Sequence, residues 1–320
     1  MRHIAAALAI IAAALAAAVH AQTYPSRNIR LVVPFPPGGP ADVMARLAAK
    51  SLTETLGQQV IVDNRPGGGS TIAAREVARA EPDGYTLLLA SAATTAIGPA
   101  LYRNIGYDPA TSFAPVAFFS STPYVMVTGP RTPLRSVQDV IAFAKQHPGK
   151  LNFGVPNGAP PHMIAAWFKS ATASDILIVP YKGAANLITD LIGGQIELGF
   201  ETTSVTLSHL RDGSMRPLGV ATPRRLPELP DVPTMIESGV PDFVAGSWIG
   251  IMAPAGTPGA IVAKLNAAIN DGLSKPDLQA RLKQLAAVTR PGSPQDFAAF
   301  MAAENPKWTA MARLSGLKAE

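Results

Sequence analysis

The stretch Ile29-Arg30-Leu31-Val32-Val33-Pro34-Phe35-Pro36-Pro37-Gly38-Gly39-Pro40-Ala41-Asp42 decides how this chain folds. Its first half is an apolar, β-branched run that is typical of a buried strand. The prolines then end the strand, because proline has no N–H to donate to a sheet, and Pro40 suits the first turn of a helix. A strand that enters a helix through a glycine turn predicts an anion site, because free N–H groups and the helix dipole face that turn. An ordinary strand-to-helix turn is the alternative.

The 320-residue chain begins with a segment that is typical of export rather than of a folded domain. A short basic start (residues 1–3) precedes an alanine-rich apolar run (4–19) and a small-residue cleavage pattern (19–21). This order predicts a secretory signal peptide over residues 1–21, and the apolar run is short for the alternative, a membrane anchor. We therefore expect a periplasmic protein that is not inserted in the membrane after cleavage.

The composition argues against several classes of protein. The chain has no cysteine, so an exported form must be stabilised by its core. Its formal net charge is +5, but lysine and arginine are scattered, which argues against nucleic-acid binding. The histidines after residue 21 (His147, His162 and His209) have no metal-site spacing, and the common catalytic motifs are missing. We expect no metal, no cofactor and no enzymatic activity.

Strand and helix patterns alternate in two units. Apolar strand patterns at 29–35, 58–63 and 85–90 are separated by helical patterns, which predicts β-α-β-α-β and a parallel sheet. After an extended segment at 115–129, a second unit of this kind runs from residue 136 to 221. A proline-rich connection (223–241) and an extended segment (243–252) lead back to the first unit. The last helix contains Pro306, which should kink or break it.

The two crossovers predict an α/β protein with two lobes. Residues 22–122 together with 243–320 form the first lobe, and residues 123–242 form the second. In parallel sheets, ligands bind beyond the carboxyl ends of the strands. The strand ends and helix N-termini of both lobes are therefore expected to face one ligand cleft, with the crossovers acting as a hinge.

Short motifs spread over the chain in a fixed order resemble one family, the Bug-type (TctC-like) solute-binding proteins of tripartite tricarboxylate transporters. The motifs are Tyr24-Pro25, the opening stretch from Ile29 to Asp42, Leu56-Gly57-Gln58, Val62-Asp63-Asn64-Arg65-Pro66-Gly67, Pro82-Asp83-Gly84-Tyr85-Thr86-Leu87, Tyr107-Asp108-Pro109, Phe113-Ala114-Pro115-Val116, Pro148-Gly149-Lys150-Leu151-Asn152, Val179-Pro180-Tyr181-Lys182-Gly183, Leu229-Pro230-Asp231-Val232-Pro233-Thr234 and Ala253-Pro254-Ala255-Gly256-Thr257-Pro258. The resemblance implies a type II-like periplasmic binding protein fold, with two parallel-type sheets flanked by helices.

The resemblance also implies a function and a site. The protein would be a monomeric receptor that closes around a small carboxylated solute and delivers it to the permease subunits of an inner-membrane transporter. One ligand carboxylate would be held by backbone N–H groups and ordered water. By position, the ligand-binding residues are Phe35, Pro36, Gly38, Gly39, Ser91, Ala92, Thr94, Asn157, Gly158, His162, Lys182, Gly183, Glu201 and Thr202. Asp42 is expected to shape the first loop and not to touch the ligand.

Two places depart from the family pattern. Pro160-Pro161 replaces part of a Ser/Gly-rich run, and a double proline stiffens that loop. Glu201-Thr202 stands where many members have Asp-Asn. A carboxylate there would attract a cationic or hydroxylated part of the ligand and would repel a second carboxylate unless it is protonated or bridged by water.

Each candidate side chain has a second interpretation. His162 could cap its own helix, Lys182 could be a solvated surface lysine, and Glu201 could bond a neighbouring helix start. Arg65 could form a structural ion pair beside the glycine loop. Two alternative functions also stay open. The closed form could dock on a membrane sensor kinase, or the protein could be an exported hydrolase on the same fold, since a dispersed Ser-His-acid triad leaves no local motif.

Overall fold

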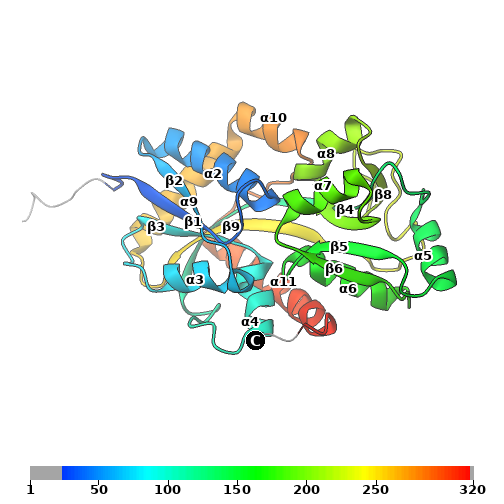
Figure 1. Cartoon of the computed structure of the whole chain (residues 1–320). Helices are drawn as coiled ribbons and strands as arrows, with labels where there is room; N and C mark the ends of the chain where they lie inside the picture. The colour runs from blue at the N-terminus through cyan, green and yellow to red at the C-terminus, as the bar shows by residue number, and fades with distance from the viewer. Residues whose placement is uncertain (1–23, 318–320) are drawn as a thin grey trace, which may run out of the picture.

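The computed structural model describes residues 24–317, so the predicted signal peptide lies outside the described residues. Within residues 24–317, nine strands are joined in one sheet, in the order β2-β1-β3-β9-β4-β7-β5-β6, with β8 paired to β4 (Figure 1). The strands are β1 (Ile29–Val33), β2 (Val60–Asn64), β3 (Thr86–Ala90), β4 (Phe113–Thr128), β5 (Asn152–Pro156), β6 (Leu177–Tyr181), β7 (Leu198–Thr202), β8 (Arg216–Val220) and β9 (Gly246–Pro254).

Helices cover the sheet along its whole length (Figure 1). They are α2 (Pro40–Leu56), α3 (Thr71–Ala78), α4 (Gly98–Leu101), α5 (Val137–Gln146), α6 (Pro160–Ala171), α7 (Ala184–Gly193), α8 (Thr203–Arg211), α9 (Gly259–Ser274), α10 (Pro276–Gln284) and α11 (Pro294–Leu314). Two single turns precede helices: a 3-10 turn, η1 (Gly68–Ser70), and a π turn, η2 (Ala93–Ile97). Among the helices of residues 24–317, none is both long and apolar enough to cross a membrane.

The predicted parallel units are present in both halves. In the first half β1 pairs in parallel with β2 and β3, and in the second half β5 pairs in parallel with β6 and β7. The long strand β4 connects them, because residues 113–123 pair with β9 and residues 124–128 pair with β7 and β8, all antiparallel. Register shifts after Pro115 and Phe118 bend this strand. The precise lobe boundaries given above stay a prediction.

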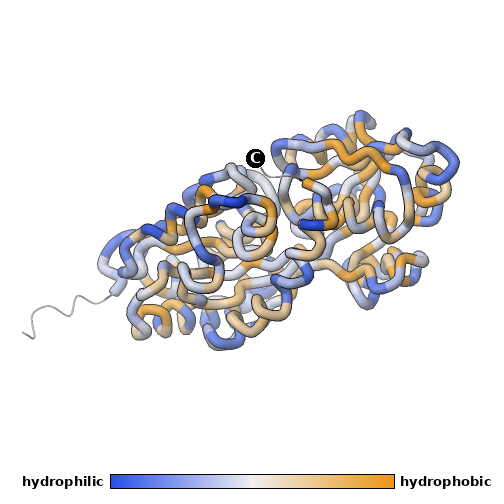
Figure 2. Tube along the Cα trace, turned by 90° about the horizontal axis from the view of Figure 1, so that it is seen from below, coloured by the Kyte–Doolittle hydropathy of each residue, from blue (hydrophilic) through white to orange (hydrophobic). Residues whose placement is uncertain are grey.

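Among the described residues, one buried apolar cluster lies in the first half, one lies in the second, and the largest has members from both. Strand β1 is almost completely buried, and α2 packs on it with Met44, Ala48 and Leu52. In the second half, aromatic rings from several elements stack together: Phe153, Phe168, Phe200 and Phe243. Figure 2 shows apolar segments running through both ends of an elongated molecule. The largest cluster includes Val32 and Leu88 of the first half together with Phe153 and Phe168 of the second, so the two halves share part of their core.

The last helix joins the two halves. Ser293 and Asp296 form the expected capping box at its start, and α11 contacts β4 and η2 as well as α6 of the second half. The predicted break at Pro306 is absent, since α11 is one continuous helix through that residue. Met301 and Trp308 are buried on either side of the proline. Tertiary packing therefore holds the helix across the position where proline removes a backbone hydrogen bond.

Candidate functional site

A cavity of about 400 Å³ lies where strand ends from both halves of the sheet meet. Prolines, glycines and alanines are most of its lining residues. The lining comes from residues 34–37, 39–41, 66–70, 156–161 and 182–186, together with Ser91, Tyr102, Tyr124, Glu201, Thr202, Ser247 and Ile249. Of these residues, Lys182 is the only basic one and Glu201 the only acidic one.

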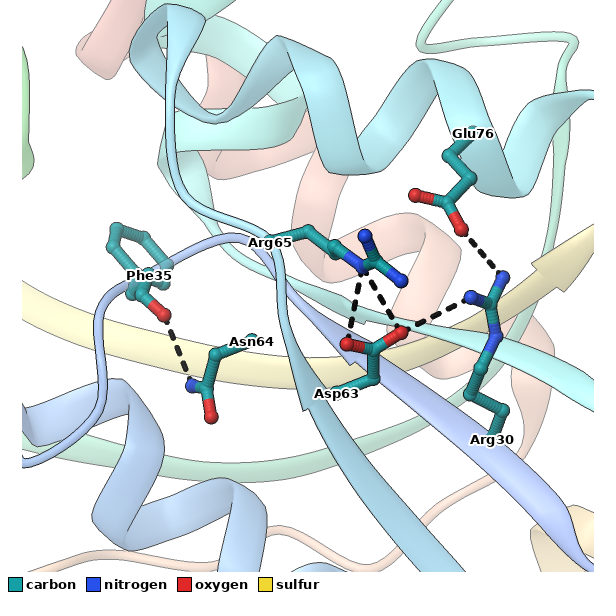
Figure 3. A network of polar contacts seen from close by, with 6 residues as sticks. All are labelled: Arg30, Phe35, Asp63, Asn64, Arg65 and Glu76. Atoms are coloured by element: carbon teal, nitrogen blue, oxygen red, sulfur yellow. Dashed lines mark hydrogen bonds and ion pairs between the residues drawn. The ribbon is translucent and has the colours of Figure 1, made fainter.

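The first wall is the turn between β1 and α2, and Asp42 holds its shape. Gly38 has a φ of +79°, which favours glycine, and its N–H donates to Asp42 Oδ2 at 3.0 Å. Asn64 Nδ2 donates to the Phe35 carbonyl and to Asp42 Oδ1, both at 3.0 Å (Figure 3 shows the former). Burial raises the pKa of Asp42, but hydrogen bonds from Arg46, Gly38 and Asn64 outweigh it and hold this pKa below its usual value.

A charged network supports the neighbouring glycine loop. Asp63 Oδ2 accepts from Arg30 at 3.0 Å and Asp63 Oδ1 from Arg65 at 3.1 Å, while Arg30 also reaches Glu76 at 2.6 Å (Figure 3). Arg65 therefore forms the structural ion pair that its position suggested. Its side chain is held by Asp63. The loop that follows (residues 66–70) lines the cavity, and its three glycines offer only backbone there.

Five helices begin at the cavity without a side-chain cap. The N-caps of α2, α3, α6, α7 and α8 are Gly39, Ser70, Ala159, Gly183 and Thr202, and none makes a side-chain capping bond. The first N–H groups of a helix have no acceptor within it and carry the positive end of the dipole. Helix starts from both halves therefore converge on this cavity and favour an anion there.

The walls from the two halves approach each other closely. A Cβ added to Gly183, between β6 and α7, would lie 3.7 Å from Pro36 Cγ in the turn between β1 and α2. Lys182 beside it is exposed, as is Asn157 in the turn after β5. A ligand in the cavity would therefore contact both halves at once.

Glu201 is unlike any other group in the wall. Its side chain is fully buried, and neither carboxyl oxygen has a hydrogen-bond partner among the described residues, so the alternative bond to a helix start is not formed. Burial raises the pKa of Glu201 to about 8, against a weaker opposing effect of the Thr202 N–H. Burial therefore favours the neutral, protonated form of this carboxyl group.

Ten of the fourteen predicted binding residues line the cavity: Phe35, Pro36, Gly39, Ser91, Asn157, Gly158, Lys182, Gly183, Glu201 and Thr202. That they bind a ligand stays a prediction.

The other four, Gly38, Ala92, Thr94 and His162, are not part of the lining. Gly38 is turned toward Asp42, and Ala92 packs in the core. The Thr94 hydroxyl is used inside its own turn, donating to the Ser91 carbonyl at 2.9 Å. His162 is buried in the first turn of α6, where its Nδ1 accepts from the Gly158 N–H at 3.4 Å. Burial lowers the pKa of His162, which favours its neutral form.

Sequence reasoning missed several lining residues. Tyr124 and Ser247 come from β4 and β9, and Tyr102 follows α4. The glycine loop at 67–69 was visible as a tight turn, but nothing in its pattern placed it at the cavity. The pairing of β4 with β9 brings Tyr124 and Ser247, which are far apart in the sequence, to one wall of the cavity.

A sequence profile described as the tripartite tricarboxylate transporter family receptor matches residues 44–317. The chain belongs to this family. The receptor is 38% identical to Protein BugT of Bordetella pertussis over 311 residues, which are 97% of this chain and 95% of that protein.

Three solved structures are similar to the receptor over nearly their whole length. The periplasmic binding protein BugD is 36% identical with a TM-score of 0.86, covering 93% of this chain and all of that one. A Rhodopseudomonas palustris protein solved with adipate is 38% identical with a TM-score of 0.87 (92% and 98% covered). MatC from Rhodopseudomonas palustris, solved with bound malate, is 33% identical with a TM-score of 0.85 (90% and 100% covered). The receptor therefore has the predicted two-lobed α/β fold of periplasmic solute-binding proteins.

Proposed function

We propose that the receptor binds a small carboxylated solute in the cavity between its two halves. The observation that carries this proposal is the convergence of five helix starts without side-chain caps on a wall rich in proline and glycine, in which Lys182 is the only basic residue among the described lining residues. Such a wall offers N–H donors and positive dipole ends to an anion, while Lys182 adds charge at an exposed position. The adipate and malate in the similar structures belong to the same chemical class.

The wider role follows from the family. We propose that the protein is exported to the periplasm after loss of residues 1–21, acts as a monomer, and delivers its ligand to permease subunits of an inner-membrane transporter. Because ligand contacts from both halves are made together, binding favours the closed arrangement by its extra affinity for that arrangement. Delivery, and not catalysis, is the proposed outcome of binding.

A thermal-shift screen of the purified protein tests this function. The compounds are adipate, malate, succinate, citrate, aromatic acids and amino acids, each paired with its amide where one exists. A true ligand stabilises the native state by about 2.7 kcal/mol at a hundredfold excess over its dissociation constant. We expect a shift with at least one carboxylate and a much smaller one with its amide. If a folded sample shows no shift with any acid, or an equal shift with the amides, the anion site is wrong.

A further inference from the structure

Tyr102 places an aromatic ring in a cavity wall that is otherwise rich in proline and glycine. It directly follows α4, and its backbone N–H donates to the Gly98 carbonyl at 2.9 Å, which fixes where the chain leaves that helix. The residue is half-buried and belongs to the lining of the cavity. Part of its surface is therefore accessible to a solute.

Two close approaches of glycine fix the position of the Tyr102 ring. A Cβ on Gly69 would lie 3.1 Å from Tyr102 Cζ and 3.2 Å from its hydroxyl oxygen, so the outer edge of the ring rests on the glycine loop. A Cβ on Gly98, at the start of α4, would lie 3.0 Å from the Gly69 carbonyl oxygen. A side chain at either position would push α4 and the loop apart. Because Gly69 also lines the cavity, the ring of Tyr102 lies at the wall and not only its backbone.

The lining that the first half contributes is mainly apolar. It consists of residues 34–37, 39–41 and 66–70 with Ser91, Tyr102, Ser247 and Ile249, and none of these described residues is charged. Two of the serine hydroxyls bond to the protein itself. That of Ser70 donates to a backbone carbonyl at 3.4 Å, and that of Ser91 accepts from a backbone N–H at 3.3 Å. Most of this surface can therefore contact only an apolar part of a solute.

The cavity has room for more than a carboxylate group. Its volume is about 400 Å³, and cavities of roughly this size accept drug-sized ligands. The helix starts can bind the carboxylate, so the body of the solute has to contact the remaining lining residues. Apolar surface gains free energy when another apolar surface covers it, and it gains none from a hydroxyl group.

We propose that Tyr102 is a specificity-determining residue: its ring contacts an aromatic or other bulky apolar body of the solute, so that this receptor prefers carboxylates with such a body to small hydroxylated acids. The inference rests on the proposed function and names the class of solute for the same cavity. An aromatic body gains an edge-to-face or offset contact with the tyrosine ring in addition to the buried apolar area.

Isothermal titration calorimetry with four acids tests the preference. Benzoate has an aromatic body and cyclohexanecarboxylate an apolar body without an aromatic ring, whereas lactate and malate are small hydroxylated acids. We expect benzoate and cyclohexanecarboxylate to bind roughly tenfold or more tightly than lactate or malate. Benzoate should bind the most tightly of the four, because it alone can form the aromatic contact.

Three variants identify the part of Tyr102 that is responsible. Tyr102→Ala should weaken benzoate binding roughly tenfold and lactate binding by less than about twofold, so the ratio of the two affinities falls. Tyr102→Phe keeps the ring and should keep the wild-type ratio. Gly69→Ala should lower the ratio as well, because the added Cβ displaces the ring while Tyr102 itself is unchanged.

Gly213→Ala is the matched control for backbone strain. Gly213 has a φ of +76° and Gly69 one of +58°, so alanine is strained at both positions, but a Cβ on Gly213 meets nothing within 4 Å. This variant should keep the wild-type ratio of affinities. Circular dichroism establishes that each variant is folded.

Three results would overturn the proposal. Binding of malate or lactate as tight as that of benzoate would remove the preference while leaving the proposed function intact. Loss of benzoate binding in a folded Tyr102→Phe protein would assign recognition to the hydroxyl and not to the ring. Equal weakening of all four acids by Tyr102→Ala would mean that the residue only supports the fold of the wall. If no carboxylate binds to the folded protein, both proposals fail.

Discussion

Asn64 holds Asp42 in place: its Nδ2 lies 3.0 Å from Asp42 Oδ1 and equally 3.0 Å from the Phe35 carbonyl. One amide at the end of β2 thus ties the last residues before the β1–α2 turn to the first turn of α2. The shape of this wall depends on a side chain from a different strand, and not only on the glycines within the turn.

Replacing Asn64 tests that dependence. Asn64→Ala removes two partly buried hydrogen bonds, so the free energy of unfolding should fall by about 1–2 kcal/mol, and affinity for the carboxylate should drop several-fold because the turn is less ordered. Urea unfolding and calorimetry measure the two effects. Arg65→Ala next to it loses only an exposed ion pair and should change neither. Equal unfolding free energies and equal carboxylate affinities in the two variants would mean that Asn64 does not organise the turn.

The contact between Pro36 and Gly183 predicts how the cavity can be blocked. Gly183 has a φ of −178°, extended backbone that any residue adopts, so substitution there introduces no backbone strain. A phenyl ring at this position would run into Pro36, because even a Cβ lies 3.7 Å from its Cγ. Gly183→Phe should weaken ligand binding at least tenfold in a protein that circular dichroism shows to be folded, and the affinity of Gly183→Ala should lie between that of Gly183→Phe and the wild type. Gly259→Phe, on an exposed helix start, is the control. Unchanged binding by Gly183→Phe would place the ligand elsewhere.

The buried acid has a pH signature that needs no ligand. Glu201 titrates near 4.5 when unfolded and at about 8 in the native protein. Between these values the native state holds a proton that the unfolded state has lost, so stability falls as pH rises, by about 1.4 kcal/mol per pH unit.

Glu201→Gln lacks this effect. Its unfolding free energy relative to wild type should therefore increase from pH 5 to pH 8 and then level off, which denaturant titrations at matched pH measure. A constant difference across that range would mean that Glu201 is ionised and solvated in the native protein.

The joint between β9 and α11 should be intolerant of added volume. A Cβ on Gly250 would lie 2.1 Å from Phe297 Cζ, in a cluster where this ring packs edge-on against Trp248. Gly250→Ala should destabilise the protein by about 1–3 kcal/mol. Gly259→Ala meets nothing within 4 Å and should be neutral or stabilising by up to about 1 kcal/mol. Thermal unfolding of both variants measures these changes in stability. An unchanged stability of Gly250→Ala would show that Phe297 can move away from the added methyl group.

Local sequence patterns were sufficient to predict the loops at the strand ends, but they did not predict every residue that lines the cavity. The prolines and glycines after β1 end a strand and begin a helix whatever surrounds them, so Phe35, Pro36 and Gly39 could be predicted. Thr94 could not be assigned, because an unpredicted π turn directs its hydroxyl back to Ser91. Tyr124 and Ser247 depend on the pairing of strands far apart in the sequence, which no local pattern contains.

The departure at Glu201 illustrates the same limit. The sequence showed an acid at a strand end and left its charge state open. Its neutral form is favoured by complete burial and by the absence of a side-chain hydrogen bond among the described residues. Both conditions arise only when β4, α7 and α8 pack around it. The sequence shows that an acid follows the strand, but its protonation state depends on the burial that only the folded structure provides.

The most direct measurement is a crystal structure of the receptor with the carboxylate that gives the largest thermal shift. We predict density for the solute in the cavity between residues 35–41 and 182–186, with one carboxylate within hydrogen-bond distance of backbone N–H groups at the helix starts. Density for the solute at another surface, or an empty cavity in crystals grown at saturating ligand, would contradict the account.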